Sequence, residues 1–255
     1  MPRKPRQKSA TDVYHVMTRG LNKMAIYKGK REKTRIVNLI RENLSAYDVS
    51  IYAYCIMPNH MHLLLKADVN ELASFMAKIL ATFAHYFNTL HTRIGYVYQD
   101  RFKSQCVTTD QYFWNCVRYI HRNPARQGTV QDMLKYNYSS LGELHMGIPD
   151  LVCREMFLTV LDRFGDMDHF LDFHRDQSRD VFCDVEEELN ENYERIAEEI
   201  LTEYSNRYNI PKDELLSYSL PRKEFESEVK KTLCISRRNI SCIEATIKEK
   251  QNGTG

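Results

Sequence analysis

Three features are missing from this sequence of 255 residues: a long apolar run, an apolar segment behind its basic start, and a closely spaced pair of cysteines. No stretch approaches the roughly 18 consecutive apolar residues that a membrane-spanning helix needs. The start MPRKPRQKSA leads into no apolar signal segment. The seven cysteines contain no CxxC pair, so neither a disulfide framework nor a zinc site is indicated. We therefore expect a cytoplasmic protein with no membrane partner.

The composition is typical of a folded globular protein, with 43% hydrophobic and 27% charged residues. The net charge of +2 averages a basic region, residues 3–35, and an acidic one, residues 150–199. A basic region suits a polyanion such as nucleic acid, although a charge run can also be a solvated face. We expect one domain over residues 1–149, an acidic helical connector over 150–184 and a helical unit over 185–255.

The hydrophobic pattern of the first 130 residues predicts a fold class. Strands are expected at 13–18, 50–57 and 60–66, an extended segment at 96–108, and helices at 31–47, 70–90 and 111–122. This order is typical of a ferredoxin-like (RRM-like) α+β sandwich, in which two helices cover one face of an antiparallel sheet. The helix at 111–122 is then free to cover the other face.

Capping residues define the expected helix ends. Asn70 and Asp110 are placed to cap the helices that follow them. Pro124 and Gly128 are placed to end the helix that begins near residue 111.

The C-terminal region is expected to be all helical. A helix at 223–232 and a second one that Ser236 can cap have the outline of a helix-turn-helix. Arg237 and Arg238 would lie in the first turn of its recognition helix. Any two packed helices can produce this pattern, so DNA reading and plain helical packing both remain open.

Two histidines in the third strand are candidate metal ligands. Strand side chains alternate, so His60 and His62 point to one face while Met61 and Leu63 point to the other, toward the two covering helices. Paired imidazoles can bind a divalent metal, which stabilises charge on a phosphoryl oxygen. A single His-x-His is more often structural, so the pattern alone has little specificity.

The helix expected on the same face carries two further candidates. Tyr119 and Asn123 are four residues apart and therefore lie on one side of that helix. A phenol can act as a nucleophile, and an amide oxygen can bind a hard metal. Taken alone, Tyr119 is more often an aromatic core residue.

Four segments together resemble a known family: YHVMTRGLNK, MPNHMHLLL, YVYQDRFKS and RYIHRNPARQG. Their sequences, order and spacing are similar to those of REP-associated tyrosine transposases and related single-tyrosine insertion-sequence transposases. The resemblance spans about residues 10 to 145.

The resemblance implies a function and a site. It implies that His60 and His62, the first and last positions of the HUH motif, bind Mg²⁺ or Mn²⁺, that Asn123 supplies a third ligand, and that Tyr119 is the nucleophile. The enzyme would be a DNA transposase whose catalytic domain covers residues 1–149, cleaving and rejoining single-stranded DNA through a 5′-phosphotyrosine, at a hairpin with a flanking guide sequence. Several members of the family carry a C-terminal DNA-binding extension.

Basic residues near these motifs are candidate contacts to the DNA backbone. They are Arg3, Lys4, Arg6, Arg19, Lys23, Arg101, Lys103, Arg118, Arg122 and Arg126. Tyr96, Tyr98 and Phe102 can stack on bases, but aromatic residues in a strand are more often core. His15 lies on the strand expected beside the third; a satisfied core histidine is favoured there over an outer contact to the metal site.

Two other functions compete with transposition. A non-catalytic module could bind single-stranded nucleic acid on the same fold, and a metal-dependent phosphodiesterase could use activated water. A pure binding module would not need the set His60, His62, Tyr119 and Asn123. A phosphodiesterase that activates water would not need Tyr119. The sequence leaves monomer and homodimer equally open.

Overall fold

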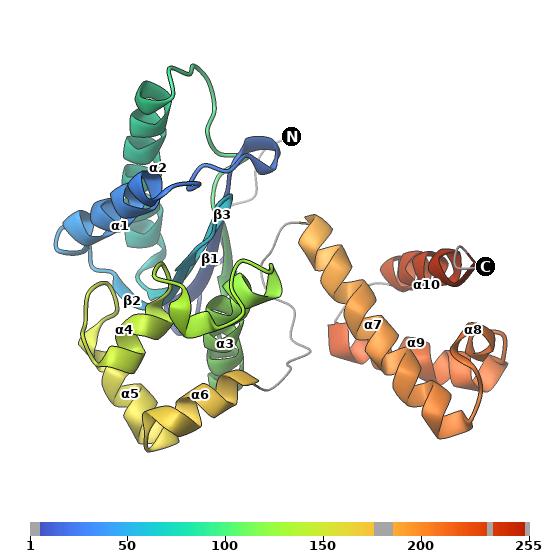
Figure 1. The fold of residues 1–255 in the computed structure, drawn as a ribbon. Coiled ribbons are helices and arrows are strands. Elements are labelled where there is room, and N and C mark those ends of the chain that lie inside the picture. The colour runs from blue at the N-terminus through green and yellow to red at the C-terminus, as the bar shows by residue number, and fades with distance from the viewer. Residues whose placement is uncertain (1–5, 176–185, 234–236, 253–255) are drawn as a thin grey trace. The chain divides into compact units, whose positions relative to one another are not determined.

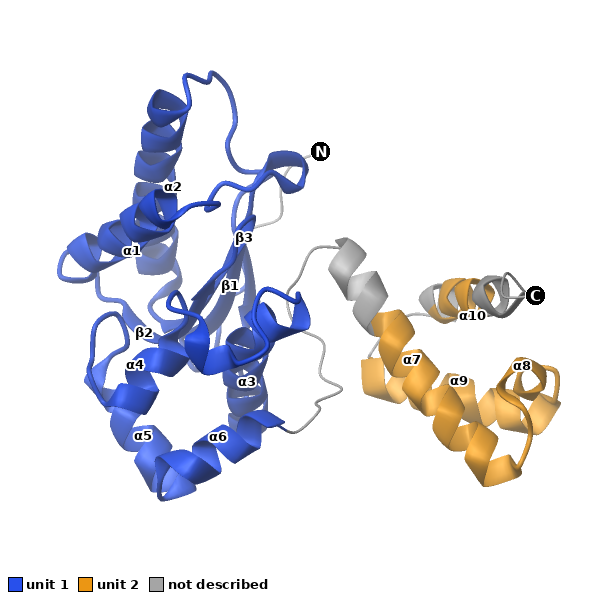
Figure 2. Ribbon diagram, viewed as in Figure 1, with its two compact units in different colours: residues 1–177 blue, residues 178–255 orange. Residues whose placement is uncertain are grey.

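The structure, a computed structural model, describes residues 6–175, 186–233 and 237–252 (Figure 1). The chain divides into two compact units, shown in different colours in Figure 2. Unit 1 comprises residues 1–177 and unit 2 comprises residues 178–255. Each unit has its own buried core.

Unit 1 is built on a four-stranded antiparallel sheet in the order β2-β3-β1-β4. Its strands are β1 (Val13–Arg19), β2 (Ser50–Ile56), β3 (His60–Lys66) and β4 (Lys103–Cys106). With α1 (Lys30–Leu44) after β1 and α2 (Val69–Leu90) after β3, this is the ferredoxin-like arrangement. The predicted fold class is confirmed.

The two faces of the sheet differ in what covers them. Helices α1 and α2 pack against each other on one side (Figure 1). Their apolar stripes, including Ile36, Ile40, Phe75 and Phe83, are fully buried. On the other face lies α3 (Asp110–Arg126), which contacts β2 and β3. The docking of this helix on the otherwise open face was predicted.

The ends of α2 and α3 correct three local predictions. Asp68 caps α2 by accepting the Asn70 N–H at 2.8 Å, and Thr109 caps α3, so neither Asn70 nor Asp110 is the cap. The Asp110 carboxylate instead accepts from Trp114 Nε1 at 3.1 Å. Helix α3 also continues past Pro124 to Arg126, because a proline in the last turns removes only one helical hydrogen bond.

The fourth strand is shorter than predicted. Only Lys103–Cys106 pair with β1, whereas 96–108 was the expected extent. Residues 95–102 instead form a loop that begins at Gly95, with φ of +109°, and lines a cavity of about 810 Å³ beside α2. The Arg6 guanidinium lies 3.8 Å from the centre of the Phe102 ring in this cavity wall.

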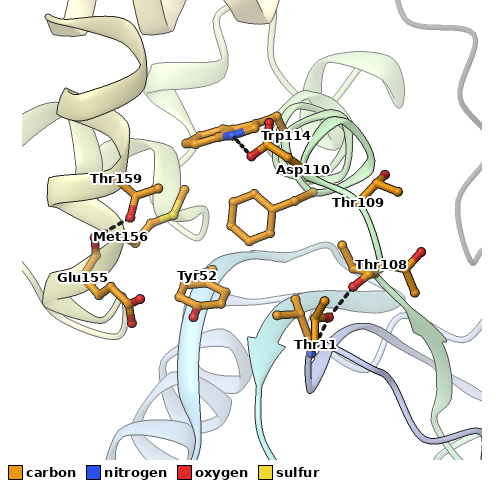
Figure 3. A pocket seen from close by; sticks show the side chains of 12 residues that line it. Thr11, Tyr52, Thr108, Thr109, Asp110, Trp114, Glu155, Met156 and Thr159 are labelled. Atoms are coloured by element: carbon orange, nitrogen blue, oxygen red, sulfur yellow. Dashed lines mark hydrogen bonds between the residues drawn. The ribbon is translucent and has the colours of Figure 1, made fainter.

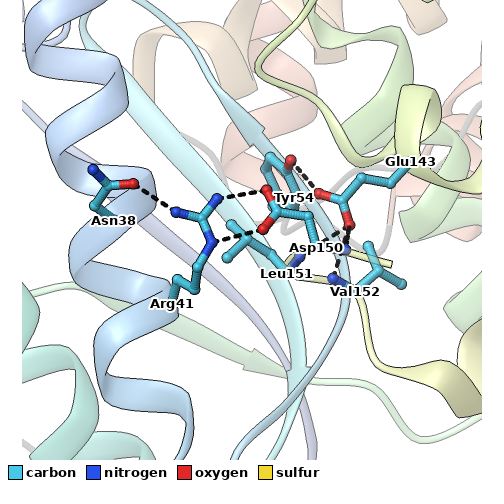
Figure 4. Close-up of polar contacts among 7 residues, drawn as sticks. All are labelled: Asn38, Arg41, Tyr54, Glu143, Asp150, Leu151 and Val152. Atoms are coloured by element: carbon cyan, nitrogen blue, oxygen red, sulfur yellow. Dashed lines mark hydrogen bonds and ion pairs between the residues drawn. The ribbon is translucent and has the colours of Figure 1, made fainter. Parts of the chain in front are cut away.

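Unit 1 extends well beyond the predicted boundary near Asp150. The segment after α4 (Ser140–Met146) runs beside the edge strand β2, where Val152 bridges Ile51. Figure 4 shows why: one oxygen of the buried Glu143 carboxylate accepts the three backbone N–H groups of residues 150–152, each at 3.0 Å. The Asp150 carboxylate also binds Arg41 of α1 through two contacts of 2.6 Å.

Aromatic packing adds the next two helices to unit 1. Phe164 and Phe170, from α5 (Arg154–Phe164) and α6 (Met167–Arg175), lie 5.0 and 6.4 Å from the Trp114 ring. Trp114 also lines a cavity of about 270 Å³ between α3 and α5 (Figure 3). Residues 154–175 were expected to lie in an acidic connector. Their aspartates are exposed, whereas aromatic side chains on the opposite side of these helices pack into the core of unit 1.

Unit 2 is helical, as the sequence indicates. Its helices are α7 (Glu186–Tyr208), α8 (Lys212–Leu215), α9 (Ser219–Leu233) and α10 (Arg237–Asn252). Its core is formed mainly by aliphatic residues, with Phe225 fully buried. The proposed cap Ser236 and the side chains of Arg237 and Arg238 lie outside the described residues, so the helix-turn-helix stays a prediction.

Within the described ranges, no helix is long and apolar enough to cross a membrane. Five cysteines lie in these ranges and all five are free thiols. Cys55 and Cys116 are buried, as expected of small hydrophobic residues, whereas Cys242 is exposed.

Candidate active site

The four residues singled out by the sequence meet between β3 and α3. His60 and His62 are fully buried on β3, and Asn123 and Tyr119 of α3 are 2% and 7% exposed. His60 Nε2 lies 3.2 Å from Asn123 Oδ1. The rings of His62 and Tyr119 are 5.4 Å apart, edge to face. Strand alternation and one helix face thus bring together residues about 60 positions apart in sequence.

The contacts of His60 leave a lone pair directed at Asn123. His60 Nδ1 lies 2.7 Å from Asn59 Oδ1, an acceptor, so this nitrogen carries a proton. In the neutral imidazole, Nε2 then has a lone pair that faces the Asn123 oxygen. The lone pairs of His60 Nε2 and Asn123 Oδ1 repel each other at this distance unless a proton or a metal cation binds to them.

His62 has a buried ring nitrogen with no hydrogen-bond partner among the described residues. This nitrogen is Nε2, while Nδ1 lies 3.0 Å from His15 Nε2. Burial, followed by electrostatic interactions with His60, His15 and Arg126 that disfavour a second positive charge, lowers the pKa of His62 well below its ordinary value. A neutral imidazole with an unused nitrogen is the form that binds metals.

These donors fit a divalent metal. Two imidazole nitrogens and one amide oxygen form a mixed set that accepts Mg²⁺ or Mn²⁺ as well as softer ions. The described residues contain no group of three or more His, Cys, Asp or Glu side chains arranged for a metal. The predicted ligand set contains only two residues of these types, His60 and His62, and its third member is Asn123.

Tyr119 is held by aromatic and cationic neighbours. Its ring lies 5.9 Å from the His15 ring, edge to face. The guanidinium carbon of Arg126, seven residues further along α3, lies 5.0 Å from the centre of the Tyr119 ring. Arg126 is exposed, so its positive charge lies at the protein surface beside the Tyr119 ring.

The predicted DNA contacts separate by exposure. Arg19 lies directly opposite His60 in the β1–β3 ladder, so both point to the site face, and it is 7% exposed. Arg122 is half-buried. Lys23, Arg101, Lys103 and Arg126 are exposed. Arg3 and Lys4 lie outside the described residues.

Arg118 is more buried than most of the predicted DNA contacts, and its role as a DNA contact stays a prediction. Its side chain is buried, donates to Asn115 Oδ1 at 2.9 Å, and lies 4.5 Å from the centre of the Phe173 ring. The Arg118 guanidinium thus packs between α3 and α6.

Sequence reasoning missed one contact of the site and left a second one open. Asn59 was treated only as a turn residue, although its position directly before His60 in the Pro-Asn-His run was a usable signal. For His15, the sequence favoured a satisfied core histidine over an outer contact to the site; the residue is fully buried and contacts His62 directly, which leaves both roles open. No local pattern marks that contact, because it joins two strands.

Comparison with known proteins places this site in a family. The family model described as "Transposase IS200 like" matches residues 9–123, a range that contains β1, β3 and α3 up to Asn123. Residues 9–123 are thus similar to the IS200-like transposases. Helices α4 to α6 and unit 2 lie beyond the matched range.

Two similar proteins extend the comparison. A Haemophilus influenzae protein with the provisional name REP-associated tyrosine transposase is 27% identical over 139 residues, which cover 48% of this chain and 79% of that protein. The chain also resembles the solved structure of a REP-associated tyrosine transposase bound to a REP hairpin, with a TM-score of 0.50 and 17% identity. That match covers 60% of this chain and 91% of the other, and it shows a shared fold.

Proposed function

We propose that this transposase cleaves and rejoins single-stranded DNA through a covalent bond to Tyr119, with the help of a divalent metal. One observation carries the proposal: α3 places Tyr119 edge-on to His62, and Asn123 Oδ1 3.2 Å from His60 Nε2. A nucleophile-bearing residue and a metal-binding set therefore share one buried site. Neither a non-catalytic binding module nor a phosphodiesterase that uses water needs both a nucleophilic tyrosine and a metal site.

The chemistry conserves bond energy. The Tyr119 oxygen attacks a phosphorus of the DNA backbone, so a bond from Tyr119 oxygen to phosphorus forms and the bond from phosphorus to the 3′ oxygen breaks. The phenol gives up one proton, and the departing 3′ oxygen takes one to become a hydroxyl. A 3′-hydroxyl then attacks the 5′-phosphotyrosine, rejoins the DNA and frees Tyr119. No ATP is consumed.

The residues around Tyr119 have distinct tasks in this step. His60, His62 and Asn123 would hold Mg²⁺ or Mn²⁺, which when bound polarises a phosphoryl oxygen. Arg126 packs on the Tyr119 ring and Arg19 lies beside His60, so positive charge is present on both sides of the site. These cations favour a phosphate between α3 and β3.

A single strand is the substrate that best fits this geometry. Tyr119 is 7% exposed on a helix that covers the sheet, and a scissile phosphate within a regular duplex is hard to bring in line with it. Lys23, Arg101 and Lys103 are exposed cations that can contact the backbone of such a strand. A structurally similar transposase is bound to a REP hairpin, which supports hairpin DNA as the first substrate to try.

The decisive experiment detects the covalent intermediate. The protein is incubated with labelled single-stranded DNA from its own locus, with Mn²⁺ or with EDTA, and separated under denaturing conditions. We expect a protein–DNA adduct that Tyr119→Phe and EDTA both abolish. Tyr112→Phe is the matched control, because Tyr112 lies two turns earlier on the same helix, and it should still form the adduct.

Other outcomes support the rival functions. Cleavage without an adduct, unaffected by Tyr119→Phe, would indicate a phosphodiesterase that uses water. Binding of hairpin DNA without cleavage, unaffected by EDTA, would indicate a non-catalytic single-strand-binding protein. Reading of DNA by Arg237 and Arg238 of unit 2 remains a prediction and is independent of these results.

A further inference from the structure

His15 contacts the candidate metal site without belonging to the ligand set. It lies on β1, two residues from Met17, which is paired with His62 across the β1–β3 ladder. Alternation therefore points His15 and His62 to the same face. Both side chains are fully buried, and their rings stack with centroids 5.1 Å apart and planes inclined by 25°.

One hydrogen bond joins the two rings and has two possible directions. His15 Nε2 and His62 Nδ1 are 3.0 Å apart, so one of them donates. If His15 Nε2 donates, His62 Nδ1 is the acceptor and the proton of His62 must reside on Nε2. That direction places a proton on His62 Nε2, a buried atom with no hydrogen bond in the described chain, whereas the opposite direction places one on His15 Nδ1, which is buried as well. Burial alone therefore does not choose between the two directions. If His62 Nδ1 donates, Nε2 keeps its lone pair free.

The second direction is the one a metal requires. A ligating imidazole commonly donates its other N–H to an acceptor, which fixes the tautomer and the ring orientation. Asn59 already stands in this relation to His60, with its oxygen 2.7 Å from Nδ1. His15 stands in the same relation to His62. The two histidines of β3 thus have matching outer partners, an amide oxygen and an imidazole nitrogen.

We propose that His15 is a positioning residue, which accepts the Nδ1–H of His62 and thereby directs the His62 Nε2 lone pair toward the metal and Tyr119. The proposal rests on the proposed function, because the metal belongs to it. The ring of His15 also touches the Tyr119 ring edge to face, at 5.9 Å. His15 therefore supports both the metal ligand and the nucleophile from the sheet side.

The first test uses the metal-free natural protein. Long-range ¹H–¹⁵N NMR correlations distinguish a histidine protonated at Nδ1 from one protonated at Nε2. We expect the His62 signal to show the proton on Nδ1. A proton on Nε2 of His62 would overturn the proposal, whatever the protein does with metal or DNA.

The second test measures Mn²⁺ binding, using the electron paramagnetic resonance signal of free Mn²⁺. His15→Phe keeps a planar ring but has no acceptor, and His15→Gln places an acceptor near the former Nε2. We expect His15→Phe to weaken Mn²⁺ binding about 10- to 100-fold and His15→Gln to restore most of the affinity. Equal affinity of His15→Phe and the natural protein, at equal thermal stability, would identify His15 as a core residue only.

The two tests distinguish a failure of the proposed metal site from a failure of the proposed role of His15. If the natural protein binds no Mn²⁺, the metal in the proposed function fails, and the position of the His62 proton still decides the role of His15. If His15→Phe does not fold, the same NMR measurement on the natural protein decides it alone. Mn²⁺ binding with the proton on His62 Nε2 would leave the proposed function standing and remove His15 from it.

Discussion

Unit 1 buries two stacked pairs of histidines that have almost the same geometry and different surroundings. His15 and His62 have centroids 5.1 Å apart, with rings inclined by 25°, and His121 and His174 are 5.0 Å apart at 26°. The linking nitrogens are 3.0 Å apart in the first pair and 2.8 Å in the second. Stacking and burial alone do not distinguish them.

The pairs differ in what their remaining nitrogens meet. His121 Nε2 lies 2.7 Å from Ser140 Oγ, and His174 Nδ1 lies 2.7 Å from the Phe170 carbonyl oxygen, so every ring nitrogen of this pair is hydrogen-bonded. In the first pair, His62 Nε2 has no such partner. A buried polar atom left unsatisfied is costly and marks a place where a ligand is expected.

The largest contrast is expected from replacing one member of each pair with glutamine. His62→Gln removes the nitrogen that we propose binds the metal, so adduct formation should fall at least about 100-fold, while the free energy of unfolding should change by less than about 1 kcal/mol. His121→Gln disturbs hydrogen bonds at both nitrogens, and should lower the free energy of unfolding by about 2 to 3 kcal/mol. Adduct formation and urea unfolding are measured on both variants.

The control for this contrast is activity per folded molecule. In His121→Gln that activity should stay close to the natural value. An equal loss of activity in both variants would show that the second pair takes part in the reaction, and the distinction drawn from hydrogen bonding would be wrong.

A smaller effect is expected from pH. Burial lowers the pKa of His174 to about 4 and holds that of His121 well below its ordinary value. In the unfolded chain both titrate near pH 6.5. Between about pH 6.5 and 4 the unfolded state thus binds more protons, and the free energy of unfolding falls as pH drops, by up to about 1.4 kcal/mol per pH unit for each histidine.

His174→Gln provides the measurement. Unfolding by urea at several pH values should give a shallower decline for this variant than for the natural protein, with little difference above pH 7. Identical slopes would mean that His174 is protonated in the folded protein as easily as in the unfolded chain.

The smallest effect separates two arginines that the sequence treats alike. Arg101 is exposed, and Arg118 packs on Phe173. Arg101→Ala should reduce the slope of log affinity against log salt for single-stranded DNA by about 0.7. Arg118→Ala should leave this slope unchanged and lower the free energy of unfolding by about 1 to 2 kcal/mol. A reduced slope for Arg118→Ala would identify it as a DNA contact.

Much of unit 1 follows from local patterns. The strands at 13–19, 50–56 and 60–66 and the helices α1 and α2 lie within a few residues of their predicted limits, because alternation and helical periodicity are properties of neighbouring residues. The fourth strand was overestimated, since the aromatic residues near Tyr96 suggest a strand but line a loop. The capping residues were misplaced by one or two positions, where a neighbouring Asp or Thr takes the role.

The domain boundary shows the limit of composition as a guide. Many acidic residues after Asp150 suggested a solvated connector, yet Glu143 fastens residues 150–152 to the sheet edge, and Trp114 holds the helices that follow. A segment can be strongly charged outside and still belong to a core. Its inner side shows only when its packing partners are known.

The sequence by itself determined the order of strands and helices, the shared face of His60 and His62, and the shared helix side of Tyr119 and Asn123, since each follows from the repeat of one element. The tertiary structure decided which layers meet: it brought α3 onto β3, set His15 against His62, and buried Arg118 behind Phe173. The physical reason is that backbone geometry fixes the direction of a side chain within its own element. The identity of its neighbour depends on how whole elements pack.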